Sequence, residues 1–173
     1  MNEDIKKRAS KIKLLLMDCD GVLTDGKITL LPNGDEQKTF NVRDGLGIVS
    51  LHKAGIQTGI ISGRSSSVVE RRAKELGIKF LQQGHHHKTA AFEQILREAE
   101  MTAEQTAYVG DDFVDIPILK LVGLAIAVND AVDEVKENGH YITKTTGGNG
   151  AVREICDLIL KSQNKWLDLI KSF

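Results

Sequence analysis

Short apolar runs recur along the chain. Each is followed by a cluster of small or acidic residues and then by a helical pattern. The runs are apolar at nearly every position, which is typical of strands buried on both faces of a parallel sheet. They predict five strands, at residues 12–17, 58–61, 79–81, 106–109 and 124–128.

Patterns with helical spacing lie between and after these runs. Residues 68–76 end at Gly77, a residue suited to a left-handed C-cap, and residues 89–100 place apolar side chains on one face. A shorter helix is predicted over 48–53 and a last major one over 152–160. Strands that alternate with helices predict an α/β fold, here a Rossmann-like three-layer domain with a mostly parallel sheet.

One segment breaks this alternation directly after the first strand. Residues 27–40 hold two short extended patterns around an Asn33-Gly34 turn and predict an inserted β-hairpin. The length of 173 residues suits one ordinary domain and leaves no room for two sizeable ones. We therefore expect residues 1–173 to form a single domain, ending in a tail of about 163–173 with apolar residues at helical spacing.

Composition narrows the class of protein. Lys and Arg number 23 against 24 Asp and Glu, and aromatic residues make up 5%, so neither the basic surface nor the stacking platform of a nucleic-acid-binding protein is expected. No apolar run approaches the roughly 20 residues that span a bilayer. Cys19 and Cys156 are too few for a disulfide framework and fit a reducing compartment. We expect a cytoplasmic protein without a nucleic-acid or membrane partner.

Acidic residues follow two of the predicted strands. Asp18 and Asp20 come at the end of the first, and Asp111, Asp112 and Asp115 follow strand 106–109. The carboxyl ends of parallel strands meet at one edge of a sheet, where gathered carboxylates need a cation or a shared proton. An all-oxygen ligand set favours Mg²⁺ over zinc. From the residues alone, an exposed Asp-x-Asp turn and helix capping by Asp111 or Asp112 remain open.

Two further strand ends supply groups that bind anions. Ser62, Gly63 and Arg64 follow strand 58–61 and lead into a helix, so a hydroxyl, backbone N–H groups and a helix N-terminus could hold phosphate oxygens. Lys88 opens the helix after the next strand and could reach the same edge. A lone lysine at that position is more often a solvated surface charge.

Together these motifs resemble the haloacid dehalogenase-like phosphohydrolases. The resemblance rests on four motifs in order: Asp18-x-Asp20-Gly-Val, Ser62-Gly-Arg, Lys88, and Gly110-Asp-Asp-x-x-Asp115. Many members carry a cap domain after the first motif or between the second and third. Neither interval here has room for one, so we expect a capless protein whose site is open unless another subunit covers it.

The resemblance implies a catalytic role for each motif. Asp18 would attack phosphorus, Asp20 would protonate the leaving alkoxide and then activate water, and Ser62 and Lys88 would hold the phosphoryl group. Mg²⁺ would be held by Asp18, the backbone carbonyl of Asp20 and Asp111. Supporting roles in orienting the metal and its waters would fall to Asp112 and Asp115.

Within this superfamily, residues 14–160 resemble the phosphatases of 3-deoxy-D-manno-octulosonate 8-phosphate, an eight-carbon sugar-acid phosphate of lipopolysaccharide synthesis. The segments that carry the likeness are residues 21–26, 40–47, 62–65 and 150–154. The family implies a homotetramer, with the hairpin packed in the assembly and a neighbour's tail able to cover the site.

The family also implies contacts with the substrate beyond the phosphate. Arginine can hold a carboxylate with paired hydrogen bonds. A solvated charge on a helix surface stays open as the alternative for Arg72. The substrate-binding residues implied by the resemblance are Asp20, Asn41, Val42, Arg43, Asp44, Gly45, Gly63, Arg64, Arg72 and Lys88.

Two departures from the family and three alternatives stay open. His87 stands where the family usually has Asp, and Asn149 where it usually has Arg. Adjacent histidines rarely converge on one ion, so residues 85–87 are interpreted as a polar loop. The alternatives are a phosphatase for a related nine-carbon sugar-acid phosphate, a phospho-receiver signalling domain and a catalytically inactive interaction module.

Overall fold

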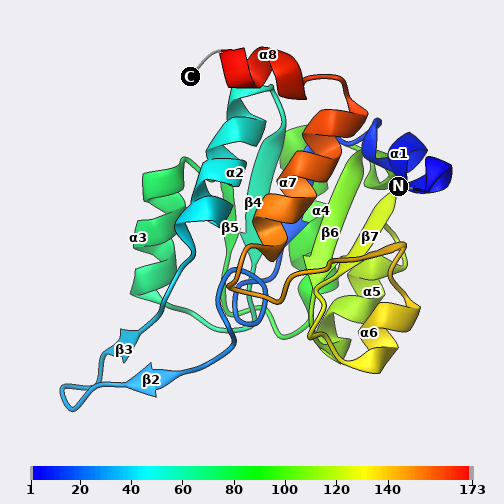
Figure 1. Ribbon diagram of the computed structural model, residues 1–173. Helices are drawn as coiled ribbons and strands as arrows, with labels where there is room; N and C mark the ends of the chain where they lie inside the picture. Colours follow the sequence, from blue (N-terminus) through cyan, green and yellow to red (C-terminus); the bar gives the residue numbers. More distant parts are fainter. Residues whose placement is uncertain (1, 172–173) are drawn as a thin grey trace.

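A six-stranded parallel sheet forms the centre of the protein (Figure 1), whose computed structural model describes residues 2–171. The strand order is β5-β4-β1-β6-β7-β8, and every neighbouring pair in this sheet is parallel. The strands are β1 Leu14–Met17, β4 Gln57–Ile61, β5 Phe80–Gln82, β6 Thr106–Gly110, β7 Leu124–Ala127 and β8 Tyr141–Ile142. The five predicted strands are confirmed. The sixth, β8, was missed because it is two residues long and is not fully buried.

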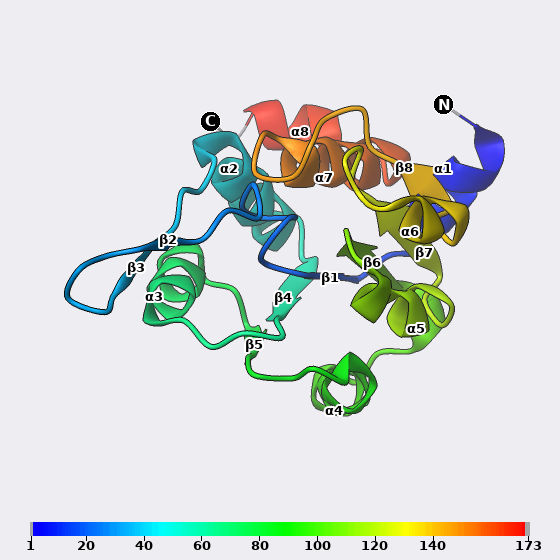
Figure 2. The same ribbon diagram turned by 90° about the horizontal axis from the view of Figure 1, so that it is seen from below.

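Helices cover both faces of this sheet. In Figure 2, α2, α7 and α1 lie on one side of it, with α3 beside α2, whereas α4 and α5 lie on the other. The layers confirm the predicted three-layer α/β fold. The helices are α1 Glu3–Ala9, α2 Val42–Lys53, α3 Ser67–Leu76, α4 Lys88–Ala99, α5 Ile116–Leu119, α6 Asp133–Glu137, α7 Ala151–Ser162 and α8 Trp166–Lys171, with 3-10 turns η1 Ala103–Gln105 and η2 Phe113–Asp115.

Side-chain and glycine caps set several helix ends. The side chain of Ser66 accepts a hydrogen bond from Val69 N at the start of α3, and Gly77 ends that helix with φ +69°, as predicted. The prediction for α2 was wrong at its N-terminus, because the helix already begins at Val42. Asn41 caps it by accepting from Arg43 N at 2.8 Å, a signal that the glycine-containing sequence after it obscured.

The predicted hairpin is present and projects from the body of the molecule (Figure 1). Its strands are β2 Thr29–Leu30 and β3 Glu36–Gln37, and Leu31 N donates to Asp35 O across the turn at 2.8 Å. Between β1 and β4 the chain forms only this hairpin and α2. Between β4 and α4 it forms only α3 and β5. Neither interval holds a cap domain.

The tail forms α8, whose side chains are partly packed against the domain. Leu169 is buried, and Trp166 lies under the ammonium group of Lys161, 4.6 Å from the ring centre. The last two residues of the predicted tail lie outside the described residues. Among residues 2–171, no helix combines the length and apolar character needed to cross a bilayer.

Candidate active site

Strand β1 places Asp18 at the carboxyl edge of the sheet. Met17 pairs with Ile60 on one side and Val109 on the other, and Asp18 N donates to Val109 O at 3.0 Å. Asp18 therefore lies at the centre of this edge, next to the ends of β4 and β6. Its position is the one at which open α/β sheets bind ligands.

Lys88, the first residue of α4, lies between two carboxylates. Its Nζ is 2.7 Å from Asp18 Oδ1 and 2.7 Å from Asp115 Oδ1, and the residue is only 3% exposed. The solvated-lysine alternative is thereby wrong. A buried ammonium group is stable here because two carboxylates offset the loss of its hydration.

Asp115 is fully engaged by protein groups. Its Oδ1 also accepts from Tyr108 Oη at 2.6 Å, and its Oδ2 accepts from Asp111 N at 3.1 Å and Asp112 N at 3.4 Å. Asp115 thus orients Lys88 and the turn that carries Asp111. Sequence reasoning missed Tyr108, whose only signal is a hydroxyl in an otherwise apolar buried strand.

Burial and mutual repulsion raise the pKa of two of these carboxyl groups. Burial raises the pKa of Asp18 to about 6, against the lowering effect of Lys88, and burial together with the Asp18 charge raises the pKa of Asp111 to about 8. Burial alone would lower the pKa of Lys88, but the charges of Asp18 and Asp115 outweigh it and the pKa is raised. Lys88 is therefore a fixed cation at neutral pH.

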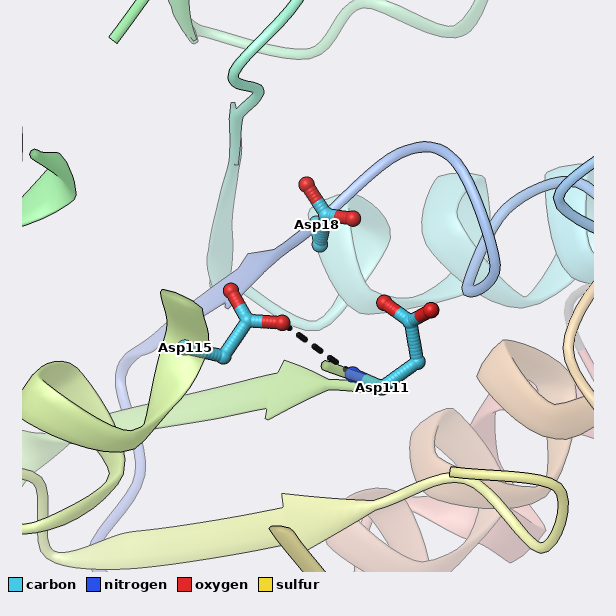
Figure 3. Close-up of side chains that lie close together, drawn as sticks. All are labelled: Asp18, Asp111 and Asp115. Carbon is cyan, nitrogen blue, oxygen red and sulfur yellow. Dashed lines mark hydrogen bonds between the residues drawn. The ribbon is translucent and has the colours of Figure 1, made fainter. Parts of the chain in front are cut away.

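The three carboxylates form a candidate metal site. In Figure 3 the side chains of Asp18, Asp111 and Asp115 turn toward one another, and one oxygen from each lies within 4.8 Å of the others. Asp111 Oδ1 is buried without a hydrogen-bond partner. An all-oxygen set with an unpartnered buried ligand atom fits a hard divalent ion such as Mg²⁺.

Gly21 makes the approach of Asp111 possible. A Cβ atom at this position would lie 2.0 Å from Asp111 Oδ2, and the backbone has φ +102°, which L side chains rarely adopt. Any larger residue would displace the carboxylate. The glycine after Asp20 is thus needed for the geometry of the site itself.

A pocket of about 180 Å³ opens beside this cluster. Ser62 Oγ accepts from Arg64 N at 3.2 Å, which fixes the loop at the end of β4. His85 and His86 contribute to the wall, a position that the polar-loop interpretation did not anticipate. The pocket is lined by Asp18, Asp20, Ser62, Gly63, Arg64, His85, His86, Lys88, Asp111, Asp112 and Val114.

Asp112 and His87 each lie directly before a helical element, η2 and α4. Asp112 caps η2 by accepting from Phe113 N at 2.7 Å, so the capping interpretation is confirmed for Asp112. Asp111, in contrast, caps no helix and faces the other carboxylates. His87 precedes α4 and makes no side-chain capping bond.

Asp20 lies at the rim of the pocket and is held by the hairpin. Lys38 Nζ forms an ion pair with Asp20 Oδ1, and Arg64 Nε lies 3.7 Å from Asp20 Oδ2. Arg64 also contacts Glu36 Oε2 at 3.1 Å. Sequence reasoning missed Lys38 and Glu36, because nothing in the pattern of a short exposed hairpin indicates which charge turns inward.

The predicted substrate-binding residues of α2 and α3 do not line this pocket. Asn41, Asp44, Gly45 and Arg72 surround a separate small cavity. Arg72 packs against Phe40, with 5.7 Å from its guanidinium carbon to the ring centre, and its Nη1 pairs with Glu75 at 2.9 Å. The guanidinium group is thus packed against protein as well as paired, and is not simply a solvated charge.

Val42 and Arg43, which also belong to the predicted substrate-binding residues, lie outside both the pocket beside Asp18 and this small cavity. Val42 is 73% exposed, and Arg43 lines an open groove together with Asn149 and Arg153. Within one chain, the structure therefore brings together the phosphate- and metal-binding candidates. Residues 41–45 and Arg72 lie outside the pocket that these candidates line.

The fold and this site define a haloacid dehalogenase-like hydrolase. The family model described as haloacid dehalogenase-like hydrolase matches residues 80–155. The 3-deoxy-D-manno-octulosonate 8-phosphate phosphatase of Yersinia pestis is 46% identical over 163 residues, covering 94% of this chain and 87% of that protein. The Escherichia coli K12 protein of the same name is 45% identical, covering 95% of this chain and 88% of its own.

Solved structures give the same result. The 3-deoxy-D-manno-octulosonate 8-phosphate phosphatase of Moraxella catarrhalis, solved in complex with magnesium ion, phosphate ion and KDO, has a TM-score of 0.97 and 43% identity. The alignment covers 100% of this chain and 99% of that one. The Yersinia pestis structure has a TM-score of 0.94 over 95% of this chain and 89% of its own. The chain belongs to the 3-deoxy-D-manno-octulosonate 8-phosphate phosphatase family.

Proposed function

We propose that this chain is a Mg²⁺-dependent phosphatase that hydrolyses 3-deoxy-D-manno-octulosonate 8-phosphate to the free sugar acid and phosphate. The observation that carries the proposal is the buried contact between Asp18 and Lys88 beside the unpartnered oxygen of Asp111, in a chain that belongs to this family. The reaction would serve lipopolysaccharide synthesis in the cytoplasm.

The mechanism uses two carboxylates in turn. Asp18 attacks phosphorus, and the bond from phosphorus to the sugar oxygen breaks as Asp20 donates a proton to that oxygen. Asp20, now ionised, removes a proton from water, which attacks the phosphorus of the aspartyl phosphate and regenerates Asp18. Lys88 and Ser62 line the pocket with Asp18 and hold the phosphoryl oxygens throughout.

Asp18, the Asp20 backbone carbonyl and Asp111 would hold Mg²⁺. When bound, the ion offsets the negative charge shared by the phosphoryl group and the carboxylates. Asp112 and Asp115 support this set from the same turn. Asp115 does so through the backbone N–H groups of Asp111 and Asp112.

The size of the pocket favours an assembly. Pockets that enclose small molecules usually measure about 300–1,000 Å³, whereas the pocket beside Asp18 measures about 180 Å³. In this proposal, residues 1–173 form one catalytic domain, and a homotetramer brings neighbouring chains over the sugar acid. The hairpin supports an interface, because Ile28 and Leu30 are apolar and exposed.

Substrate recognition would combine both parts of this assembly. Gly63 and Arg64 lie beside the phosphate pocket and can contact the substrate directly. Residues 41–45 and Arg72 would contribute where chains meet.

Phosphate release from a panel of sugar phosphates, with and without Mg²⁺, tests the proposal. We expect the eight-carbon acid phosphate to be hydrolysed with the highest kcat/KM, and chelation to abolish release. A clear preference for the nine-carbon acid phosphate would replace the substrate. Stable stoichiometric phosphorylation of the chain without turnover would instead indicate a receiver domain.

A further inference from the structure

We propose that Lys38 is a positioning residue that holds the carboxylate of Asp20 in place for proton transfer and thereby links the hairpin to catalysis. The inference rests on the proposed function, in which Asp20 is the proton donor. Neither the motifs nor the resemblance indicated a role for this lysine. Its side chain is not among those that line the pocket with Asp20.

The burial of Lys38 is unusual for its place in the chain. Lys38 directly follows the hairpin strand β3, yet its side chain is only 1% exposed. Lys27, at the other end of the same hairpin, has a side chain that is 83% exposed. A long cation is rarely buried without an anion beside it, and the carboxylate that meets Lys38 is that of Asp20.

Asp20 is held from both of its oxygens. Lys38 pairs with Oδ1, and Arg64 Nε lies 3.7 Å from Oδ2. Glu36 completes a ring of alternating charges, since its Oε1 is 3.9 Å from Lys38 and its Oε2 is 3.1 Å from Arg64. While Asp20 is ionised, before it takes up the proton that it later donates, the two cations and two anions balance formally, so the ring can lie at the rim of the site without leaving an unpaired charge.

The two cations have different relations to the substrate. Arg64 lines the pocket and is about half exposed, so it is free to turn toward an arriving anion. Lys38 is enclosed, and its ion-pair partners are Asp20 and Glu36. The lysine therefore restricts the rotation of the carboxylate while Arg64 exchanges partners. A reacting group displaced by about 1 Å can lose roughly 10²-fold in rate.

Leaving-group dependence separates this role from phosphate binding. A sugar alkoxide needs a proton as it departs, whereas p-nitrophenolate leaves as a stabilised anion and does not. kcat/KM reports the steps up to departure of the leaving group. It should therefore depend strongly on Asp20 for the sugar-acid phosphate and only weakly for p-nitrophenyl phosphate. General acid catalysis typically contributes about 10²–10⁴-fold.

The experiment compares Lys38→Met with Lys27→Met on the two substrates at saturating Mg²⁺. For Lys38→Met we expect kcat/KM to fall roughly 10–100-fold on the sugar-acid phosphate and less than about threefold on p-nitrophenyl phosphate. Retained activity on the second substrate also shows that the variant folds. Lys27→Met should match the parent on both, and Lys38→Arg should recover part of the loss.

Equal losses on both substrates would overturn the inference, because Lys38 would then serve phosphate binding or folding. Unchanged activity of Lys38→Met on the sugar-acid phosphate would overturn it as well. If the unmodified chain hydrolysed no sugar-acid phosphate, the proposed function would itself be wrong. That outcome is seen before any variant is measured.

Discussion

The sheet edge and the hairpin hold charge in contrasting ways. The sheet-edge cluster, Asp18, Lys88, Tyr108, Asp111 and Asp115, is built on strand ends and the first turn of a helix, and its ion pairs are largely removed from water. The hairpin network, Asp20, Glu36, Lys38 and Arg64, joins the rim of the site to a segment whose strands are two residues long. The cluster is fixed by the core, whereas the network depends on where the hairpin lies.

This difference matches the two kinds of chemistry in the proposed mechanism. The nucleophile, its metal and the phosphoryl group need a fixed geometry, which a packed parallel sheet supplies. The proton donor has to act on two different oxygens, those of the sugar and of water. A carboxylate at the rim, held in place by Lys38, lies where both oxygens can approach it.

Replacing Asp18, the proposed nucleophile, should give the largest effect on activity. Asp18→Asn removes the attacking oxygen, and we expect phosphate release to fall by roughly 10⁴-fold or more. The Asp115 contact with Lys88 remains in this variant, so the fold should persist by circular dichroism. Asp25→Asn, which changes an exposed carboxylate in the same loop, is the matched control. Near-normal turnover by Asp18→Asn would assign the nucleophile elsewhere.

Removing the buried cation should give the largest loss of stability. Lys88→Met leaves Asp18 and Asp115 without their common partner, and breaking a buried ion pair in this way costs about 3–5 kcal/mol. Urea unfolding at a fixed protein concentration measures the change. Lys136→Met breaks a surface pair with Asp133 and should cost less than about 1 kcal/mol. Similar losses in the two variants would show that the buried pairs of Lys88 stabilise the fold no more than a surface ion pair does.

The sheet-edge cluster was largely predictable from the sequence, for a physical reason. Buried parallel strands are recognisable as continuous apolar runs, and their carboxyl ends must meet at one edge. Acidic and basic residues that follow such runs therefore converge whatever the intervening sequence, as Asp18, Lys88 and Asp111 do.

The hairpin network was not predictable in the same way. The inward direction of the Lys38 side chain depends on the orientation of the hairpin relative to the α/β domain. Strands of two residues carry no periodic pattern that could predict this orientation. Tyr108 was missed because its aromatic ring fits the apolar pattern of a buried strand, and that pattern gives no sign that the hydroxyl is used. The resemblance indicated residues 41–45 and Arg72, but one chain does not bring them to the pocket.

Metal binding to the sheet-edge cluster should depend on pH. The folded-state pKa values of Asp18 and Asp111, about 6 and about 8, exceed the ordinary value of 3.8. Between about pH 4 and 8 these two groups therefore bind more protons in the metal-free folded chain than in the unfolded chain, and the stability they contribute falls as the pH rises. Mg²⁺ must displace these protons, so its affinity should increase by up to about tenfold per pH unit for each proton displaced between pH 6 and 8.

Calorimetric titration with Mg²⁺ at several pH values measures this dependence. The melting temperature of the chain in the presence of a chelator, at the same pH values, measures the loss of stability. Asp168→Asn, a change on α8, should reproduce both profiles. An Mg²⁺ affinity that stayed constant from pH 6 to 8 would show that neither carboxylate takes up a proton in this range.

Changing an exposed apolar residue of the hairpin should have the smallest effect on the folded chain and a visible effect on its assembly. Leu30 is 73% exposed, so Leu30→Ser should alter the stability of the dissociated chain by less than about 0.5 kcal/mol. In the proposed tetramer the same side chain is covered by neighbours, and losing it should shift the assembly to smaller species in light scattering. Lys27→Ser, at a polar and equally exposed position of the hairpin, should leave the assembly unchanged. If Leu30→Ser instead destabilised the dissociated chain as strongly as Lys88→Met, the hairpin would belong to the rigid part of the molecule, and the contrast between the two regions would not hold.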